Sequence, residues 1–316
     1  MNKKMKIVFM GTPDFAVTIL KALVESNYNI VGVITAPDKP AGRGRKLNES
    51  AVKKYARSQE LHIMQPKNLK AETFVAQLEA LKANLQIVVA FRMLPKVVWQ
   101  MPVYGTFNLH ASLLPNYRGA APINWAIIYG ETQTGVSTFF IDEKIDTGTM
   151  ILQEIIDITL NETAGSLHDK LMHLGSDLVI KTVKLIEQGS VKTTPQSEYN
   201  DLKTAHKLNH DNCKIDWSIN IDHIYNKVRG LNPYPAAWSN LFNEKETIRV
   251  KIYSVEKEIA VHNYNIGAIL TTKKEVKVAV KNGYIIIHEM QMPGKRKMTT
   301  KDLLNGFTFS EDAKML

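Results

Sequence analysis

Apolar and polar residues follow two different patterns along the chain, and the change between them divides it into two parts. In the first part, short apolar runs are separated by stretches where apolar residues recur at helical spacing, as Ile19, Leu20 and Leu23 do. We expect strands at residues 6–10, 30–35, 86–90, 106–110, 135–141 and 150–158, and helices at 16–25, 71–82, 122–129 and 164–188. Strands that alternate with helices predict an α/β fold with a doubly wound, mostly parallel sheet.

The second pattern begins after Gly189. Residues 190–209 are polar and show little periodicity, which is typical of a linker. A helical pattern at 221–229 then precedes short alternating runs at 236–242, 247–255, 268–271, 276–280 and 284–290. These runs predict a small antiparallel β-barrel of the OB-like kind. Because 316 residues exceed one typical domain, we place a catalytic domain at 1–190, a linker at 191–209 and a barrel-like domain at 210–316.

Composition restricts the class of protein. Hydrophobic residues make up 44% and charged residues 22%, which are ordinary values for a globular chain. Cys213 is the single cysteine, so no intramolecular disulfide is expected. The apolar run near the N-terminus ends at Gly11 and is too short for a signal peptide or a membrane span. The expected location is the cytoplasm.

The formal net charge of +9 is concentrated in two regions. Residues 38–57 contain seven Lys or Arg against two acids, a net +5, whereas residues 1–200 as a whole contain 22 against 18, a net +4. Residues 201–316 contain 18 basic and 13 acidic residues, again +5. Two separate basic regions indicate a polyanionic partner that touches both. The alternative is a basic surface that serves solubility alone.

Candidate catalytic chemistry lies at the end of the expected strand 106–110. Asn108 and His110 are two residues apart, so their side chains project to the same side of the strand. Ligands of open α/β sheets bind beyond the carboxyl ends of the strands. An amide and an imidazole together can stabilise the oxyanion of an acyl transfer, and a neutral His can accept the proton that an amine loses. A hydrogen-bonded strand end is the alternative interpretation of this pair.

A carboxylate near His110 would orient the ring and support its charged form. The loop that follows the strand 135–141 contains three candidates, and we choose Asp146, which precedes Thr147 and Gly148. Asp142 and Glu143 are the alternatives. An Asp before Thr-Gly is also a common turn residue, so the motif alone does not decide its role.

Taken together, these motifs resemble the folate-dependent formyltransferases, and most closely the members that act on methionyl-tRNA. Asn108-x-His110 is followed by Ser-Leu-Leu-Pro at 112–115 and, about thirty residues on, by Asp-Thr-Gly at 146–148. Further similar stretches are 10–16, 39–47, 118–122, 135–138, 216–217, 229–238 and 293–297. The resemblance therefore covers nearly the whole chain.

The resemblance implies a Rossmann-like catalytic domain and a role for each motif. It implies that the catalytic residues are Asn108, His110 and Asp146, and that the folate site is lined by Ser112, Leu113, Leu114 and Pro115. The implied donor is 10-formyltetrahydrofolate, and the implied acceptor is the amino group of methionyl initiator tRNA, which becomes formylated for translation initiation. The segment 39–47 is implied to be a tRNA-binding loop through Arg43, Arg45 and Lys46. Ala111 stands where many members have Gly and is expected to narrow the folate approach slightly.

Other activities stay open at this point. A formyltransferase for a small amine, such as glycinamide ribonucleotide or an amino sugar, would not need the basic loop or the second domain. A catalytically idle RNA-binding protein would not need Asn108, His110 and Asp146 together. No His-Glu-x-x-His motif or cysteine pair indicates a metal site, and we expect no metal, no membrane and no obligate protein partner.

Overall fold

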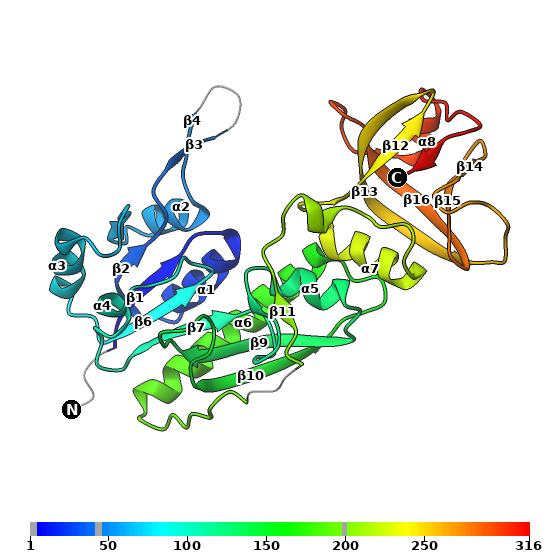
Figure 1. Cartoon of the computed structure of the whole chain (residues 1–316). Helices are drawn as coiled ribbons and strands as arrows, with labels where there is room; N and C mark the ends of the chain where they lie inside the picture. The colour runs from blue at the N-terminus through cyan, green and yellow to red at the C-terminus, as the bar shows by residue number, and fades with distance from the viewer. Residues whose placement is uncertain (1–4, 42–45, 198–200) are drawn as a thin grey trace. The chain divides into compact units, whose positions relative to one another are not determined.

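The structure is a computed structural model that describes residues 5–41, 46–197 and 201–316 (Figure 1). The chain folds into two compact units, each assembled from several segments. The first unit comprises Met1–Gly119, Thr134–Ile156 and His168–Lys203, and the second comprises Ala120–Gln133, Asp157–Leu167 and Thr204–Leu316. The domains expected from sequence are continuous segments, whereas two short segments before residue 190 lie within the second unit.

A seven-stranded sheet forms the centre of the first unit, with the strand order β10-β9-β7-β6-β1-β2-β5. The strands are β1 Lys6–Gly11, β2 Asn29–Ile34, β5 Ile63–Met64, β6 Leu85–Val89, β7 Thr106–His110, β9 Gln133–Phe140 and β10 Met150–Asp157. The pairs from β5 to β7 are parallel, and β9 runs antiparallel to β7. The expectation of a mostly parallel sheet is confirmed.

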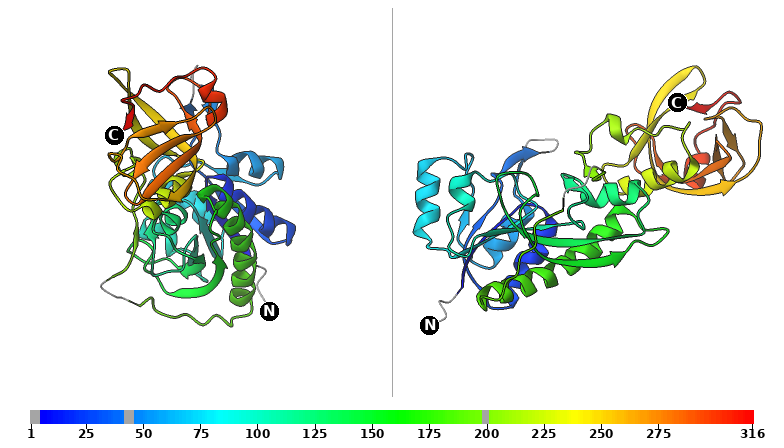
Figure 2. Two further views of the ribbon diagram at one scale, coloured as in Figure 1. Left: turned by 90° about the vertical axis from the view of Figure 1, so that its right-hand side faces the viewer. Right: turned by 60° about the horizontal axis from the view of Figure 1, so that its bottom comes forward.

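Helices pack on both faces of this sheet, as a doubly wound fold requires (Figure 2). They are α1 Asp14–Glu25, α2 Ala51–Ser58, α3 Glu72–Ala80, α4 Lys96–Trp99 and α6 Ala164–Glu187. Val8 and Val88 pack in one cluster with Phe74 of α3. Because side chains alternate along a strand, Ile7 of β1 points to the other face, where it is fully buried.

The strand β7 has the bounds expected from sequence and fixes the faces of the candidate residues. Asn108 is paired with Val88 of β6, which belongs to the cluster beneath α3. Asn108 and His110 therefore lie on the α3 face of the sheet, while Leu109 points to the opposite face. His110 is the last residue of the strand, so it stands at the edge where parallel α/β sheets bind ligands.

A hairpin of β3 Lys39–Ala41 and β4 Lys46–Asn48 occupies the basic segment of the first unit. Arg43 and Arg45 lie outside the described residues, as does the side-chain environment of Lys46. At its base, Lys53 forms ion pairs with Asp38 and Glu49, and Arg57 forms one with Glu49 at 2.8 Å. Lys53 and Arg57 thus pair with both acids of segment 38–57.

The second unit contains a seven-stranded sheet with the order β14-β15-β16-β13-β12-β18, and β17 pairs with β16 off this path. Its strands are β12 Ala237–Asn243, β13 Glu246–Ile259, β14 Ile269–Thr271, β15 Val276–Val280, β16 Gly283–Gln291, β17 Met298–Thr299 and β18 Lys314–Met315. The two ends of this order approach each other, because Ile269 donates a backbone hydrogen bond to Ala313 and Met315 donates one to Gly267. The expected antiparallel barrel is therefore nearly closed.

The helix α7 Ile221–Leu231 buries its apolar side in the core of this barrel. Ile221, Ile224 and Val228 follow a spacing of three or four residues, which puts them on one side of the helix. The second unit also contains α5 Pro122–Ile128, the short α8 Thr300–Leu304, the 3₁₀ turn Asp211–Cys213 and the short strand β11 Thr204–Ala205. None of the helices in the described part of the chain is long and apolar enough to cross a membrane.

Candidate active site

The candidate site is centred on His110, whose side chain is almost fully buried at 8% exposure. Its Nδ1 lies 3.7 Å from Oδ2 of Asp146. Its Nε2 lies 2.8 Å from the main-chain carbonyl of Tyr117, a hydrogen bond in which the imidazole N–H donates. Each ring nitrogen therefore faces an oxygen, so both N–H groups of a protonated ring have an acceptor nearby. The structure brings together two of the residues that the sequence selected.

Asp146 is held in place by the loop that carries it. Its φ of 55° lies in the left-handed region, which Asp adopts more readily than most residues. Its Oδ2 also accepts a hydrogen bond of 3.0 Å from the backbone N–H of Gly119. A Cβ at Gly148 would stand 1.7 Å from the carbonyl oxygen of Phe140, so no other residue fits there without moving the backbone. The Asp-Thr-Gly motif is thus explained by the shape of this turn.

The two alternative carboxylates of this loop have other partners. Asp142 accepts hydrogen bonds from the Thr147 hydroxyl at 2.7 Å and from the backbone N–H of Lys144 at 3.0 Å, so it stabilises the turn. Glu143 is exposed and bound to Lys96 at 2.5 Å, and this hydrogen bond holds the pKa of its carboxyl below the usual range. Neither forms an ion pair with His110 among the described residues. The geometry therefore favours Asp146.

Gln196 is a positioning residue that sequence analysis missed. Its side-chain amide donates to the carbonyls of Asp146 at 2.9 Å and Gly148 at 2.8 Å. Its Oε1 accepts from Nε and Nη2 of Arg118 at 3.1 and 2.7 Å. One amide thus joins the Asp146 loop to the segment that contributes Tyr117 and Gly119. Gln196 lies in the polar stretch that was assigned as a linker, where hydrophobic periodicity gives no signal.

Replacing Gln196 with leucine tests this positioning. The substitution keeps the approximate size and removes hydrogen bonds worth about 1 kcal/mol each. We expect turnover to fall about tenfold, because a misplaced Asp146 supports His110 less well. Gln188→Leu is the matched control, since Gln188 is exposed just after α6. Equal turnover of both variants, measured per folded molecule, would show that Gln196 does not position the site.

Asn108 has a different environment from its two partners. It is half-buried, and its side chain has no hydrogen-bond partner among the described residues. Its neighbours across the sheet are Val88 and Phe139, neither of which offers a polar side chain. The amide of Asn108 therefore has donors and an acceptor to offer a ligand at the same edge as His110.

The segment from Ser112 to Pro115 is fixed by hydrogen bonds from β9 and β10. Ser112 is fully buried, and its hydroxyl donates to the carbonyl of Asn116 at 2.8 Å. Ser137 donates to the carbonyl of Ser112 at 2.6 Å, and Gln153 donates to the carbonyl of Leu114 at 2.8 Å. The polar groups of Ser112 are thus used within the protein. Leu113 and Pro115 are the half-buried members of this segment, and Leu114 is buried.

The side chain of Arg92 is bound within the protein. Its guanidinium donates hydrogen bonds to the main-chain carbonyls of Pro66 and Lys67. Among residues 5–41, 46–197 and 201–316, no group of three or more His, Cys, Asp or Glu side chains is arranged to hold a metal ion.

Comparison with known families gives two matches that follow one another along the chain. Residues 5–183 match the family "Formyl transferase", and residues 207–308 match "Formyl transferase, C-terminal domain". A methionyl-tRNA formyltransferase of Flavobacterium johnsoniae is 60% identical over 313 residues, which is 99% of both chains. One of Bacteroides fragilis is 53% identical over 319 residues, covering 99% of this chain and 98% of that protein.

Solved structures of lower identity share the fold. An N-formyltransferase of Helicobacter canadensis, in complex with folinic acid and dTDP-3-aminofucose, has a TM-score of 0.64 at 20% identity. The alignment covers 93% of this chain and 100% of that one. HypX of Aquifex aeolicus, in complex with tetrahydrofolic acid, has a TM-score of 0.64 at 18% identity over 96% of this chain and 47% of HypX. At these identities the likeness concerns architecture alone.

Proposed function

Since this chain belongs to the formyl transferase family, we propose that it transfers the formyl group of 10-formyltetrahydrofolate to the amino group of methionyl initiator tRNA. The observation that carries the proposal is the 60% identity with a methionyl-tRNA formyltransferase over 99% of both chains. The candidate site adds an amide, an imidazole and a carboxylate at the edge of a doubly wound sheet. Such a reaction takes place where translation does, so the proposal puts the protein in the cytoplasm.

The proposed reaction exchanges one bond for another at the formyl carbon. The methionine amine attacks this carbon and forms a tetrahedral intermediate with an oxyanion. The bond between the formyl carbon and N10 of the folate then breaks, and the formyl group remains on the amine. The amine loses one proton and N10 gains one, so atoms and charge balance. The protein has to stabilise the oxyanion and to move this proton.

Asn108 and His110 are proposed to share these two tasks. The amide of Asn108 is free to donate a hydrogen bond to the oxyanion. The Nε2 of His110 is bonded to the carbonyl of Tyr117 in the free protein, and a substrate group would replace that acceptor. Asp146, 3.7 Å from Nδ1, supports the charged ring once it has accepted a proton.

The folate is proposed to lie along residues 112–115, as the resemblance implies. Because hydrogen bonds from Ser137 and Gln153 hold this segment rigid, it offers the donor a preformed wall rather than free hydrogen-bonding groups. Folinic acid and tetrahydrofolic acid occupy two proteins of the same fold, which supports a reduced folate as the donor here. No metal ion takes part in the proposed chemistry.

Contact with tRNA is proposed for the basic loop of the first unit and for one face of the barrel. On that face, the guanidinium of Arg249 lies 4.5 Å from the ring centroid of Trp238, and Lys214 lies 5.8 Å from the same ring. Lys314 lies 5.4 Å from the ring of Phe242. None of these three cations forms an ion pair among the described residues, although Lys214 interacts electrostatically with the carboxylate of Asp216. Unpaired cations beside aromatic rings suit a phosphate backbone.

The direct test is a formylation assay with purified protein, 10-formyltetrahydrofolate and a panel of amino-acylated tRNAs. We expect formylation of methionyl initiator tRNA and little of elongator tRNAs. Glycinamide ribonucleotide and an amino sugar nucleotide serve as small acceptors in parallel reactions. Preferential formylation of either small acceptor would overturn the assigned substrate while leaving the formyl donor intact.

Arg43→Ala separates the tRNA reaction from small-acceptor chemistry. Arg43 lies in the basic segment 38–57, whose formal net charge is +5, and its guanidinium can bind phosphates or a base edge. We expect kcat/KM for methionyl initiator tRNA to fall about ten- to a hundredfold at one fixed salt concentration. The affinity for folate should differ from that of the unmodified protein by less than about twofold.

Lys54→Ala provides the matched control for Arg43→Ala. Lys54 carries the same charge in the same basic segment, but it is exposed on α2 outside the loop. If the loop reads tRNA, Lys54→Ala should change kcat/KM only slightly. Equal effects of the two substitutions would mean that general positive charge, rather than Arg43, attracts the RNA.

A further inference from the structure

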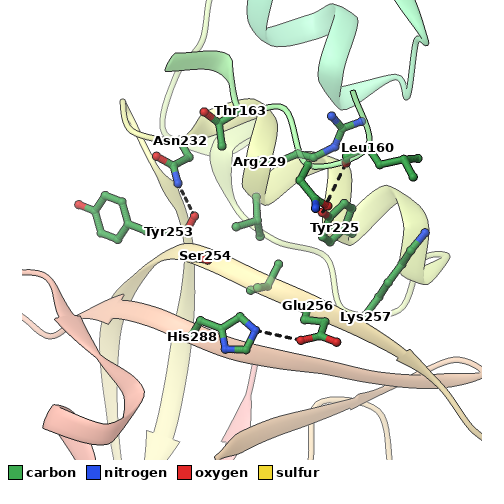
Figure 3. Close-up of a pocket in the computed structure, with 13 residues that line it drawn as sticks. Leu160, Thr163, Tyr225, Arg229, Asn232, Tyr253, Ser254, Glu256, Lys257 and His288 are labelled. Atoms are coloured by element: carbon green, nitrogen blue, oxygen red, sulfur yellow. Dashed lines mark hydrogen bonds and ion pairs between the residues drawn. The ribbon is translucent and has the colours of Figure 1, made fainter. Parts of the chain in front are cut away.

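A cavity that none of the candidate active-site residues lines lies within the barrel unit (Figure 3). Its volume is about 540 Å³, within the range of small-molecule sites. The lining comes from the segment before α6, from α7, from β13 and from β16. β13 changes its register with β16 around Ser254, and this irregularity lies in the wall of the cavity. No step of the proposed reaction uses these residues.

Three charged side chains line the cavity, of which Lys257 pairs with Asp222 and Glu256 faces His288, while Arg229 is the one that is half-buried. Its Nε donates to Asn226 at 2.8 Å, and its Nη1 donates to the main-chain carbonyl of Glu162 at 3.0 Å. Nη2 has no hydrogen-bond partner, and no carboxylate pairs with the guanidinium, among the described residues. Burial lowers the pKa of Arg229 from its usual value, and the electrostatic interactions with Tyr225 and Glu162 offset only part of this effect. A guanidinium fixed in this way has donors left for an anion.

The remaining walls provide ring faces and unused polar groups. Tyr225 and Tyr253 line the cavity and stand on opposite sides of the close-up (Figure 3). The ring of Tyr225 already lies 5.8 Å from the guanidinium carbon of Arg229 and 5.5 Å from the ammonium of Lys257. The hydroxyl of Ser254 has no hydrogen-bond partner among the residues that the structure describes. One wall thus offers aromatic surface beside positive charge.

We propose that this cavity is a binding site for a nucleotide, with its phosphate on Arg229 and its base against a tyrosine ring. A guanidinium with unused N–H groups donates hydrogen bonds to a phosphate, and a nucleobase is a flat group that stacks on a tyrosine ring. The volume suits one nucleotide and not a folded RNA element. The nucleotide is either free in solution or one residue of a bound RNA, and only the second source depends on the proposed function.

Two substitutions of Ser254 test the site without removing any observed contact. Ser254→Asp introduces a negative charge into the wall, and Ser254→Asn introduces a neutral group of the same shape. Both variants keep Arg229 and its bonds to Asn226 and Glu162. Binding of AMP, GMP, CMP and UMP is measured by calorimetry, and binding of methionyl initiator tRNA by filter retention at one salt concentration. Arg229→Gln is a further variant, with its melting temperature checked because its contacts to Glu162 and Asn226 change.

We expect Ser254→Asp to weaken nucleotide binding about tenfold or more and Ser254→Asn about threefold or less, because only the aspartate repels the phosphate. If the two variants differ in this way in their affinity for free nucleotides, the result supports a nucleotide site filled from solution. If the two variants differ only in their affinity for tRNA, the result supports a site filled by a residue of the RNA. Equal binding by both variants with every probe overturns the proposal. The formylation assay is scored separately: a protein that formylates methionyl-tRNA but shows equal binding keeps the proposed function and loses this site.

Discussion

Replacing His110 with alanine is expected to lower the turnover of formyl transfer by about two to four orders of magnitude. The ring is buried, faces Asp146 with one nitrogen and bonds the Tyr117 carbonyl with the other, so no neighbouring side chain can take its place. Single-turnover rates with methionyl-tRNA measure the effect. The melting temperature and the folate affinity of the variant show whether fold and donor binding survive.

His110→Gln distinguishes the two tasks proposed for the ring. Glutamine keeps a hydrogen-bond donor near the position of Nε2 but does not accept a proton near neutral pH. If His110 mainly stabilises the oxyanion, the glutamine variant should recover much of the lost rate. If His110 carries the proton, glutamine and alanine should be equally slow. Turnover of the alanine variant within about threefold of the unmodified protein would remove His110 from the mechanism.

The fold followed closely from sequence where a hydrophobic pattern was long or regular. The strands at 106–110 and 276–280 have the expected bounds, and the period of two in β7 correctly put Asn108 and His110 on one face. The short helices α2 and α4 were not expected. α4 has only four residues, too few for a periodic pattern, and α2 lies in a basic segment, although Ser50 caps it by accepting a hydrogen bond from the N–H of Lys53.

The site was harder to predict wherever it depends on loops. Nothing in the order Asp142, Glu143, Asp146 says which carboxylate faces His110, because the answer depends on a left-handed residue and a turn that only Gly148 permits. Gln196 acts across 50 residues of chain on the carbonyl of Asp146, and a polar linker gives no sign of such a contact. Hydrophobic periodicity locates elements, whereas hydrogen bonds between loops depend on the completed fold.

Asp146→Asn should reduce turnover roughly a hundredfold or more, while folate affinity changes little. Asparagine has nearly the same shape and tolerates the φ of 55° found here, so the substitution removes the charge and little else. Its side-chain oxygen can still accept the hydrogen bond from the N–H of Gly119. What is lost is the negative charge 3.7 Å from Nδ1 that supports a protonated His110.

The control for this change stands four residues earlier in the same loop. Asp142→Asn alters a carboxylate that binds the Thr147 hydroxyl and the N–H of Lys144, so it should lower the melting temperature without slowing turnover per folded molecule. The two variants therefore separate a charge that acts on the reaction from a charge that holds a turn. If Asp146→Asn behaved as Asp142→Asn is expected to, with reduced stability and normal turnover, Asp146 would be a turn residue and His110 would act without a carboxylate partner.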